Sequence, residues 1–438
     1  MDAVFTPRSV AVYGASRDER KLGHTLLRNL VSGGFRGRVV AVNPAGGHVL
    51  GLPAVPALEE GVDLALISVP AVAASAAVED AARARCRAAI VLASGFGETG
   101  GGGRAVEERL AATGRAAGMR LVGPNCMGVV SRLDDGTWLN GSYFWRLPES
   151  AGGVSMVSQS GAFGGMFFAE ARRRRLGVAR FLSVGNSADV IETDALEWLA
   201  EDPATQVVGL FVEAFREGRR FVAAAERCEK PIVVLKAGKA GGGARAAVSH
   251  TGSLAGSHGA VQAAFARAGV IEAETSDGFF DALQALAAGV RPLGPAVAVL
   301  TVSGGPGVLA ADCAEGLGLR LPPPGEATVR RLRELAPAFA ASGNPVDLTP
   351  QCPPESFGPA VEAVFSDPAY DAVVVIDCGL DVPEFGRGVV AAARKTGKPV
   401  TAFLLDVPAM EAELLAAAIP VLPSPERAVA ALAAGKLR

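Results

Sequence analysis

The feature that most constrains the fold is a repeated alternation of short apolar runs with longer helix-like stretches along the chain. Runs such as SVAVYGAS, VDLALISVP and AAIVLASG are short and end in turn residues, which is typical of buried strands. Strands that alternate with helices predict parallel sheets with crossover connections. The sequence therefore predicts an α/β protein built from doubly wound domains.

Three successive blocks show this alternation. We expect a Rossmann-like domain in residues 1–130, a flavodoxin-like domain in 151–292 and a second flavodoxin-like domain in 295–438. The stretch SRLDDGTWLNGSYFWRLPESAGG, between the first two, is less regular, and we interpret it as a domain junction. The later blocks resemble each other, because MVSQSGAFGGMFFAEA parallels VLTVSGGPGVLAADCAE and each block carries Lys-Pro before a strand. Two copies are too few for a solenoid, so we expect two related domains.

Composition narrows the functional classes. The chain has 438 residues, half of them apolar, and a formal net charge of −3, so we expect no general affinity for nucleic acid or an anionic membrane. Its six cysteines show no CxxC spacing, which argues against a disulfide framework and a zinc site. We find no signal-peptide pattern and no apolar run near the roughly 20 residues of a membrane span. We therefore expect a cytoplasmic protein.

The turn after the first predicted strand suits an anion. Gly14 and Gly23 flank the entry into a helix, where N–H groups and the helix dipole favour a phosphate. GxGxxG is missing, and the second predicted strand ends in Asn43 and Pro44 instead of an acid for a ribose hydroxyl, which disfavours NAD. Another phosphate-bearing adenine ligand is permitted, and the alternative is a tight turn that binds nothing.

Further turns of the first block follow predicted strands in VPA, SGFGE and GPNCMG. They should surround the same cleft, because ligands of doubly wound sheets bind at the carboxyl ends of the strands. Cys126 lies in GPNCMG without a histidine partner nearby, so we interpret it as a packing residue in preference to a nucleophile.

The later blocks carry the other candidate motifs. Two helix starts with hydroxyl and N–H donors are predicted, at SQSGAFGG (158–165) and at SGGPG (303–307). The two starts could converge on one anion. The alternative for each motif is a glycine turn that binds nothing. His250 lies in a segment rich in glycine and serine, where a neutral imidazole can attack a phosphoryl group and hold it as an N–P bond. Its other ring nitrogen then needs an acceptor, for which Glu213 is a candidate, the alternative being an exposed strand-end acid. His258 is assigned no role.

These motifs resemble those of the NDP-forming acyl-CoA synthetases. GPNCMG, SQSGAFG, SVGNSADV, LFVEAF, KPIVVLKAGK, SHTGSLAG, SGGPG and NPVDLTP occur in the order of that family, over nearly the whole chain. The resemblance is to the alpha subunits of ADP-forming acetate–CoA ligase, which are relatives of succinyl-CoA synthetase. It implies a CoA-binding domain followed by two flavodoxin-like domains. It also implies the reaction of acid, CoA and ATP to acyl-CoA, ADP and phosphate, through an acyl phosphate and a phosphohistidine.

The resemblance also implies roles for individual residues. His250 would be the phosphorylated histidine, and Glu213 the glutamate that orients it. The implied phosphate-binding residues are Ser158, Gln159, Ser160, Gly161, Ser303, Gly304, Gly305 and Gly307. The implied CoA-binding residues are Gly14, Ala15, Ser16, Asn43, Pro44, Ser68, Val69, Pro70, Gly97, Glu98, Asn125 and Cys126.

The family also uses an ATP-grasp domain, and we find no glycine-rich ATP-binding hairpin with downstream metal-binding acids in this sequence. The resemblance therefore implies a separate beta subunit that binds ATP or ADP with Mg²⁺, in a homodimer or an alpha2beta2 assembly. The expected ligands of this chain are CoA, a small carboxylic acid and phosphate, without a metal. Three alternatives stay open. A non-catalytic CoA- or acyl-CoA-binding regulator is disfavoured by the presence of His250 and Glu213, and an oxidoreductase is disfavoured by the missing GxGxxG motif. The third is a specialised biosynthetic ligase.

Overall fold

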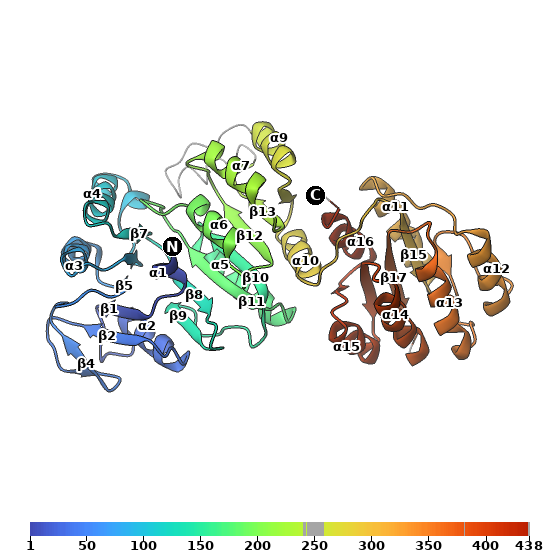
Figure 1. Ribbon diagram of the computed structural model, residues 1–438, viewed down its shortest axis with the longest axis horizontal. Coiled ribbons are helices and arrows are strands. Elements are labelled where there is room, and N and C mark those ends of the chain that lie inside the picture. Colours follow the sequence, from blue (N-terminus) through green and yellow to red (C-terminus); the bar gives the residue numbers. More distant parts are fainter. Residues whose placement is uncertain (240–241, 243–257, 381, 437–438) are drawn as a thin grey trace. The chain divides into compact units, whose positions relative to one another are not determined.

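The computed structural model describes residues 1–239, 242, 258–380 and 382–436. Within them the chain forms three sheets in two compact units, Met1–Glu274 and Thr275–Arg438 (Figure 1). The first unit holds two seven-stranded sheets and the second holds a five-stranded sheet. The predicted α/β class is confirmed. Every helix in these ranges is too short or too polar to cross a membrane.

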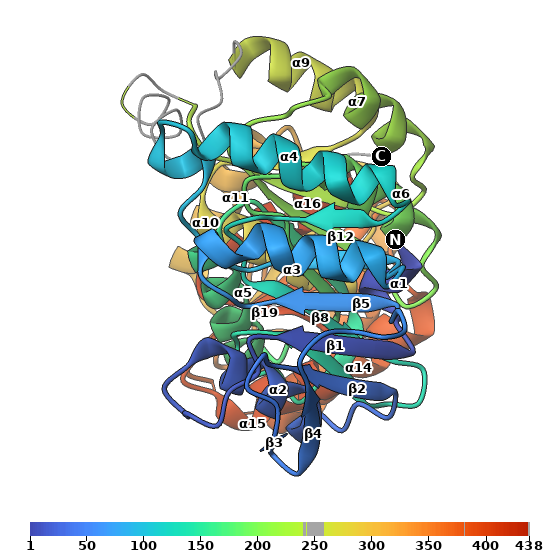
Figure 2. The ribbon, with the colours of Figure 1, turned by 90° about the vertical axis from the view of Figure 1, so that its left-hand side faces the viewer.

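The first sheet has the strand order β3-β4-β2-β1-β5-β6-β7, in which only β3 is antiparallel to its neighbour. Helices α3 and α4 pack on one face of this sheet and α2 packs on the other (Figure 2). The chain winds outward from β1 in both directions, so the switch point lies between β1 and β5. The elements are β1 (Ser9–Tyr13), α2 (Leu22–Ser32), β2 (Arg38–Val42), β3 (His48–Val49), β4 (Leu52–Val55), β5 (Leu64–Ile67), α3 (Ala71–Arg83), β6 (Ala88–Val91), the 3₁₀ helix η1 (Gly97–Thr99), α4 (Gly103–Ala116) and β7 (Arg120–Val122).

The second sheet has the order β14-β13-β12-β10-β11-β8-β9. Its first five strands are parallel, and β8 and β9 add an antiparallel hairpin at one edge. The switch point lies between β10 and β12. The elements are β8 (Gly128–Arg132), β9 (Trp138–Ser142), β10 (Ala151–Ser158), α5 (Gly161–Arg173), β11 (Val178–Ser183), α6 (Glu192–Glu201), β12 (Val207–Val212), α7 (Gly218–Arg227), β13 (Ile232–Lys236), α9 (His258–Ala268) and β14 (Ile271–Ala273).

The β8–β9 hairpin differs from the irregular stretch that we predicted in this part of the chain. Its turn is closed by Asp135, whose Oδ1 accepts hydrogen bonds from the backbone N–H of Thr137 at 3.0 Å and from the hydroxyl of Thr137 at 2.6 Å. The hairpin also contacts the first sheet's helix α2, because Asn29 Nδ2 donates to the carbonyl of Ser142 at 2.8 Å. It therefore connects the two sheets of the first unit.

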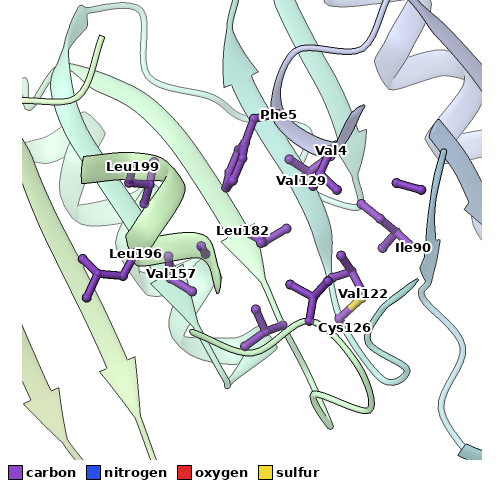
Figure 3. Packing of buried hydrophobic residues seen from close by; sticks show 14 of the residues in the cluster. Val4, Phe5, Ile90, Val122, Cys126, Val129, Val157, Leu182, Leu196 and Leu199 are labelled. Carbon is purple, nitrogen blue, oxygen red and sulfur yellow. The ribbon is translucent and has the colours of Figure 1, made fainter. Parts of the chain in front are cut away.

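One continuous hydrophobic core joins the first and second sheets. Figure 3 shows Val4 and Phe5 of the short helix α1 (Asp2–Phe5) on the same side of this core as Val129 of β8. The ring of Phe5 stacks on that of Trp198, with 4.4 Å between the centroids, and Trp198 Nε1 donates to the carboxylate of Asp2 at 2.6 Å. The shared core explains why both sheets lie in one compact unit.

The third sheet is parallel, with the order β16-β15-β17-β18-β19. Helix α10 lies in this second compact unit, where Arg427 Nε on α16 donates to the carboxylate of Asp281 on α10 at 2.6 Å. The elements are α10 (Ser276–Ala287), β15 (Val297–Thr301), α11 (Gly304–Gly316), α12 (Glu326–Leu335), β16 (Val346–Asp347), α13 (Pro354–Ser366), β17 (Ala372–Cys378), α14 (Pro383–Thr396), β18 (Val400–Leu405), α15 (Pro408–Ala416), β19 (Val421–Leu422) and α16 (Pro425–Ala434).

The second and third sheets repeat a local structure around the two Lys-Pro pairs. Lys230 Nζ donates to the backbone carbonyl of Asp202 at 2.6 Å, and Lys398 Nζ donates to that of Asp367. Each aspartate ends a helix and precedes a proline and an alanine. Burial lowers the pKa of both lysine ammonium groups. The two Lys-Pro pairs therefore occupy equivalent positions, as the sequence parallel predicts for related domains.

Candidate functional site

The turns predicted to bind CoA after β1, β2 and β5 lie along one edge of the first sheet. Asn43 Nδ2 donates to the carbonyl of Ala15 at 2.6 Å, which holds the turn after β2 against the turn after β1. Ser68 Oγ lies 3.0 Å from the hydroxyl of Tyr143, just beyond β9. This edge contains the switch point, where doubly wound sheets bind ligands. The predicted residues on it are Gly14, Ala15, Ser16, Asn43, Pro44, Ser68, Val69 and Pro70.

Close backbone contacts require glycine at this edge. Gly14 has a φ of +82°, and a Cβ atom there would lie 2.3 Å from the carbonyl oxygen of Ser68. A Cβ atom on Gly23, in the first turn of α2, would lie 1.9 Å from the carbonyl oxygen of Gly14. The start of α2 therefore packs directly against the turn after β1. Arg17 and Lys21, which sequence reasoning did not select, are exposed near this helix start and add positive charge.

Glu98 and Asn125 meet through a residue that sequence reasoning missed. Asn186, in SVGNSADV after β11, donates from Nδ2 to Glu98 Oε2 at 2.6 Å, and Asn125 Nδ2 donates to Asn186 Oδ1 at 3.1 Å. Although burial opposes the effect, hydrogen bonds from the Gly95 backbone N–H and the Asn186 amide lower the pKa of Glu98. Asn186 thus joins two CoA-site candidates to the second sheet. Its position in a motif shared with the family was the only available signal.

Gly97 and Cys126 present no side-chain group to this edge. The backbone N–H of Gly97 donates to the carboxylate of Glu107 at 3.0 Å. Cys126 is 4% exposed and packs in the core that joins the first two sheets (Figure 3). Its Sγ donates to the carbonyl of Val91 at 3.4 Å, and burial raises the pKa of its thiol to about 12. The structure therefore supports packing for this side chain, and the CoA contact that the resemblance implied for Cys126 stays a prediction.

The two predicted phosphate-binding turns lead into helix starts that share one pattern of hydrogen bonds before the helix. Only the start of α5 also has a side-chain cap, in which the N–H of Phe163 donates to Ser160 Oγ at 3.3 Å. Ser160 is the N-cap residue of α5, and Ser303 is that of α11. Ser158 Oγ accepts from the N–H of Ser160 at 3.1 Å and donates to its carbonyl at 2.7 Å. Thr301 Oγ1 makes the same two bonds with Ser303, both at 2.8 Å. Each strand-end hydroxyl thus fixes an N-cap, beyond which the first helical N–H groups have no intrahelical acceptor.

The predicted glycines occupy the first turn of each helix. Gly161 begins α5, and Gly304 begins α11, followed by Gly305 and Gly307. A Cβ atom on Gly305 would meet nothing within 4 Å, so packing does not require glycine there, whereas one on Gly307 would lie 3.0 Å from Thr301 Cγ2. The two helix starts belong to different compact units, and binding of an anion at either one stays a prediction.

Gln159 fixes the chain at Glu213, across the switch point of the second sheet. Its Oε1 accepts from the backbone N–H groups of Glu213 at 2.7 Å and Ala214 at 3.1 Å. Its Nε2 donates to the carbonyl of Ala214 at 2.8 Å and to the carboxylate of Glu192 at 3.2 Å. Its own N–H donates to the carbonyl of Phe211 at 3.1 Å. These bonds occupy its side-chain amide and its backbone N–H and make Gln159 a positioning residue for the turn at Glu213; the implied phosphate contact stays a prediction.

Glu213 itself directly follows β12 and is 6% exposed. Lys236, at the end of β13, donates from Nζ to the carbonyl of Glu213 at 2.6 Å, so the backbone of Glu213 is held from both sides. Glu192 nearby is fully buried, and burial raises the pKa of its carboxyl group. His250, the predicted nucleophile, lies outside the described residues, and its role stays a prediction.

Comparison with known proteins shows which family combines these parts. Three family models match the chain in order: a CoA binding domain over residues 8–132, a succinyl-CoA ligase like flavodoxin domain over 151–286 and a ligase-CoA domain over 297–412. The alpha subunit of acetate–CoA ligase [ADP-forming] I from Pyrococcus furiosus is 35% identical over 454 residues, which cover 99% of this chain and 96% of the relative. The chain belongs to the family of ADP-forming acetate–CoA ligase alpha subunits. The resemblance seen in the sequence motifs is confirmed.

Other members of this family differ in length. Acetate–CoA ligase [ADP-forming] I from Archaeoglobus fulgidus is 40% identical over 381 residues, which cover 86% of this chain and 54% of the relative, so this chain matches about half of that protein. Among solved structures, a dinucleotide-forming acetyl-coenzyme A synthetase 1 from Candidatus Korarchaeum cryptofilum, in complex with phosphate and ADP, is 34% identical. It superposes with a TM-score of 0.92 over 99% of this chain and 96% of that chain.

Proposed function

We propose that this chain is the alpha subunit of an ADP-forming acyl-CoA synthetase, which reversibly makes acyl-CoA from a carboxylic acid, CoA and ATP. The observation that carries the proposal is the fixed turn at Glu213. Gln159 and Lys236 hold its backbone at the carboxyl end of the sheet, beside the N-capped start of α5. In a chain of this family, such a turn suits a carboxylate that orients an imidazole while a helix start binds the phosphoryl group.

CoA would bind along the edge of the first sheet. Helix α2 starts against the turn at Gly14, with Arg17 and Lys21 exposed nearby, which suits the phosphates of CoA. The turns at Asn43 and Ser68 would complete the site. Family membership and the match to a CoA binding domain support this assignment.

The chemistry in the direction of synthesis has three steps. The phosphoryl group of ATP is transferred to a ring nitrogen of His250, and ADP leaves. A carboxylate oxygen of the acid then attacks the phosphorus, so that the N–P bond breaks and an acyl phosphate forms. The thiolate of CoA attacks the acyl carbon, the C–O bond to phosphate breaks, and acyl-CoA and phosphate are released. Glu213 would accept a hydrogen bond from the other ring nitrogen and so keep His250 in the nucleophilic tautomer.

A separate beta subunit with an ATP-grasp domain would bind ATP or ADP with Mg²⁺, and an alpha2beta2 assembly would bring both parts together. Acetate is the first acid to test, because a relative that matches nearly the whole chain is named an acetate–CoA ligase.

The decisive experiment measures phosphorylation of this chain. The protein is purified under native conditions from its own cells, with any chain that copurifies, and is incubated with acetyl-CoA and [³²P]phosphate. We expect an acid-labile, alkali-stable label on the wild-type chain and none on the His250→Ala variant. Equal labelling of both proteins would rule out the proposed nucleophile. In a second arm with [γ-³²P]ATP and Mg²⁺, labelling of this chain in the absence of any second chain would contradict the separate beta subunit.

A further inference from the structure

A cluster of charged residues at the ends of β13 and β14 has no part in the mechanism above. Glu272 lies on β14, opposite Val234 of β13, and its side chain is 11% exposed. Lys239 follows β13, and its Nζ lies 2.8 Å from Glu272 Oε1. His258 is the first residue of α9, and its Nε2 lies 3.8 Å from the same carboxylate oxygen. One carboxylate thus lies close to two basic side chains.

The place of these basic residues in the sequence gives the cluster its significance. Lys239 precedes and His258 follows the part of the chain that contains His250. Both flanks of that part therefore lie against the same carboxylate. The cluster also adjoins the fixed turn at Glu213, because Lys236 at the end of β13 donates to the Glu213 carbonyl.

The charges of this cluster depend on one another. A carboxylate as buried as that of Glu272 is costly unless a cation pairs with it. Although burial opposes its charge, the carboxylates of Glu272 and Glu274 raise the pKa of Lys239, so its ammonium group is charged at neutral pH. Lys239 Nζ also donates to Glu274 at 3.0 Å and to the carbonyl of Ala273 at 3.3 Å. Three groups therefore hold the Lys239 ammonium group: the carboxylate of Glu272, the carbonyl of Ala273 and the carboxylate of Glu274.

His258 is held less tightly than Lys239. Its Nδ1 is buried and has no hydrogen-bond partner among the described residues, and 3.8 Å is too long for a hydrogen bond between Nε2 and Glu272. The Glu272 carboxylate is the one negative group within ion-pair distance of this ring in the described part of the chain. Removal of the Glu272 charge would therefore take away the one described ion-pair partner of His258 and leave Lys239 paired only with Glu274, whose side chain is 70% exposed, and with the carbonyl of Ala273.

We infer that Glu272 is a positioning residue for phosphoryl transfer, which holds Lys239 and His258 and thereby fixes the chain on both sides of His250. This inference rests on the proposed function. In this proposal Glu272 acts through its two partners, Lys239 and His258. Misplacement of a nucleophile by about 1 Å can cost about a hundredfold in rate, so a fixed base for this part of the chain matters for the chemistry.

The test compares two substitutions on neighbouring positions. Glu272→Gln removes the shared charge with little change of shape. Glu274→Gln is the matched control, because Glu274 also pairs with Lys239, at 3.0 Å, but its side chain is 70% exposed. The initial rate of labelling from acetyl-CoA and [³²P]phosphate is measured for the natively purified protein, well below the Tm of each variant. We expect Glu272→Gln to lower the maximal rate about tenfold to a hundredfold, with the KM for acetyl-CoA unchanged. Glu274→Gln should stay within about twofold of the wild type.

Each outcome decides between the hypotheses. Equal maximal rates for wild type and Glu272→Gln, or a raised KM with an unchanged maximal rate, would overturn the positioning role. If Glu272→Gln does not fold, the His258→Asn variant is measured instead. His258→Asn should lower the maximal rate of labelling about threefold or more, and an unchanged rate would again overturn the positioning role of Glu272. A wild-type chain that takes up no label contradicts the proposed function itself. A labelled wild type with an equally labelled Glu272→Gln variant contradicts only the role of Glu272.

Discussion

The link between Gln159 and Glu213 can be tested by replacing Gln159 with methionine. Methionine has a similar length but offers no hydrogen-bonding amide. The substitution deprives the N–H groups of Glu213 and Ala214 of their acceptor and removes one of the donors to the carboxylate of Glu192. The core around these residues keeps nearly the same volume, so the effect comes from lost hydrogen bonds.

The magnitude follows from the burial of each group. A buried polar group left without a partner costs about 1–3 kcal/mol. Glu213 and Glu192 are buried and bear most of this cost, whereas Ala214 is partly exposed and water can replace its partner. We expect the free energy of unfolding to fall by about 3–5 kcal/mol. Because the turn at Glu213 is no longer fixed, we expect the rate of phosphorylation to fall about a hundredfold.

Urea unfolding and the [³²P]phosphate labelling assay measure the two effects separately. Gln206→Met is the control, because Gln206 is exposed and the same chemical change there should alter stability by less than about 0.5 kcal/mol. An unchanged free energy of unfolding for Gln159→Met would refute the reasoning about buried hydrogen bonds. A less stable variant that is phosphorylated at the wild-type rate would refute the positioning of Glu213.

Three further predictions concern other parts of the first unit. Gly23→Ala places a Cβ atom 1.9 Å from the Gly14 carbonyl oxygen, so we expect CoA binding in a calorimetric titration to weaken at least about tenfold. Gly218→Ala is the control, because its Cβ atom meets no atom within 4 Å, and it should bind CoA as the wild type does. Burial raises the pKa of the Glu192 carboxyl group in the folded chain, so ionisation of Glu192 lowers the free energy of unfolding of the wild type as pH rises from its unfolded pKa through its folded pKa. Glu192→Gln has no such ionisation, so urea titrations should show its stability relative to the wild type increasing over this pH range. A difference in stability that stays constant with pH would contradict this prediction. Because burial raises the pKa of Cys126 to about 12, iodoacetamide at pH 8 should modify it only after unfolding, as peptide mass spectrometry can show.

The strands, turns and helix starts could be predicted because each depends on nearby residues. The apolar run before Ser158 and the small residues after it are sufficient to predict a strand followed by a helix start, and the same holds for the strand that ends at Thr301 and the helix after Ser303. The hairpin of β8 and β9 was not predicted, although the Asp-Gly pair at Asp135 is typical of a turn between two paired strands.

The contacts within the candidate site could not be predicted from the sequence. Gln159 acts on backbone groups 54 and 55 residues away, and a backbone N–H carries no residue-specific signal. Asn186 likewise joins Glu98 to Asn125 across two sheets, at separations set only by the fold. The burial of Cys126 depends on the core that both sheets share.

The hairpin of β8 and β9 determines how this protein can be divided. A genetic crossover or an expression fragment that ended at residue 130 would cut through β8, since that strand runs from Gly128 to Arg132. The piece that ends at residue 130 would lose the Ser142 carbonyl that accepts a hydrogen bond from Asn29. In the remaining piece β11 would lose its partner strand β8 and become an open edge that invites aggregation. Exchange of CoA-binding modules between relatives therefore has to join the chain before Gly128 or keep both modules together.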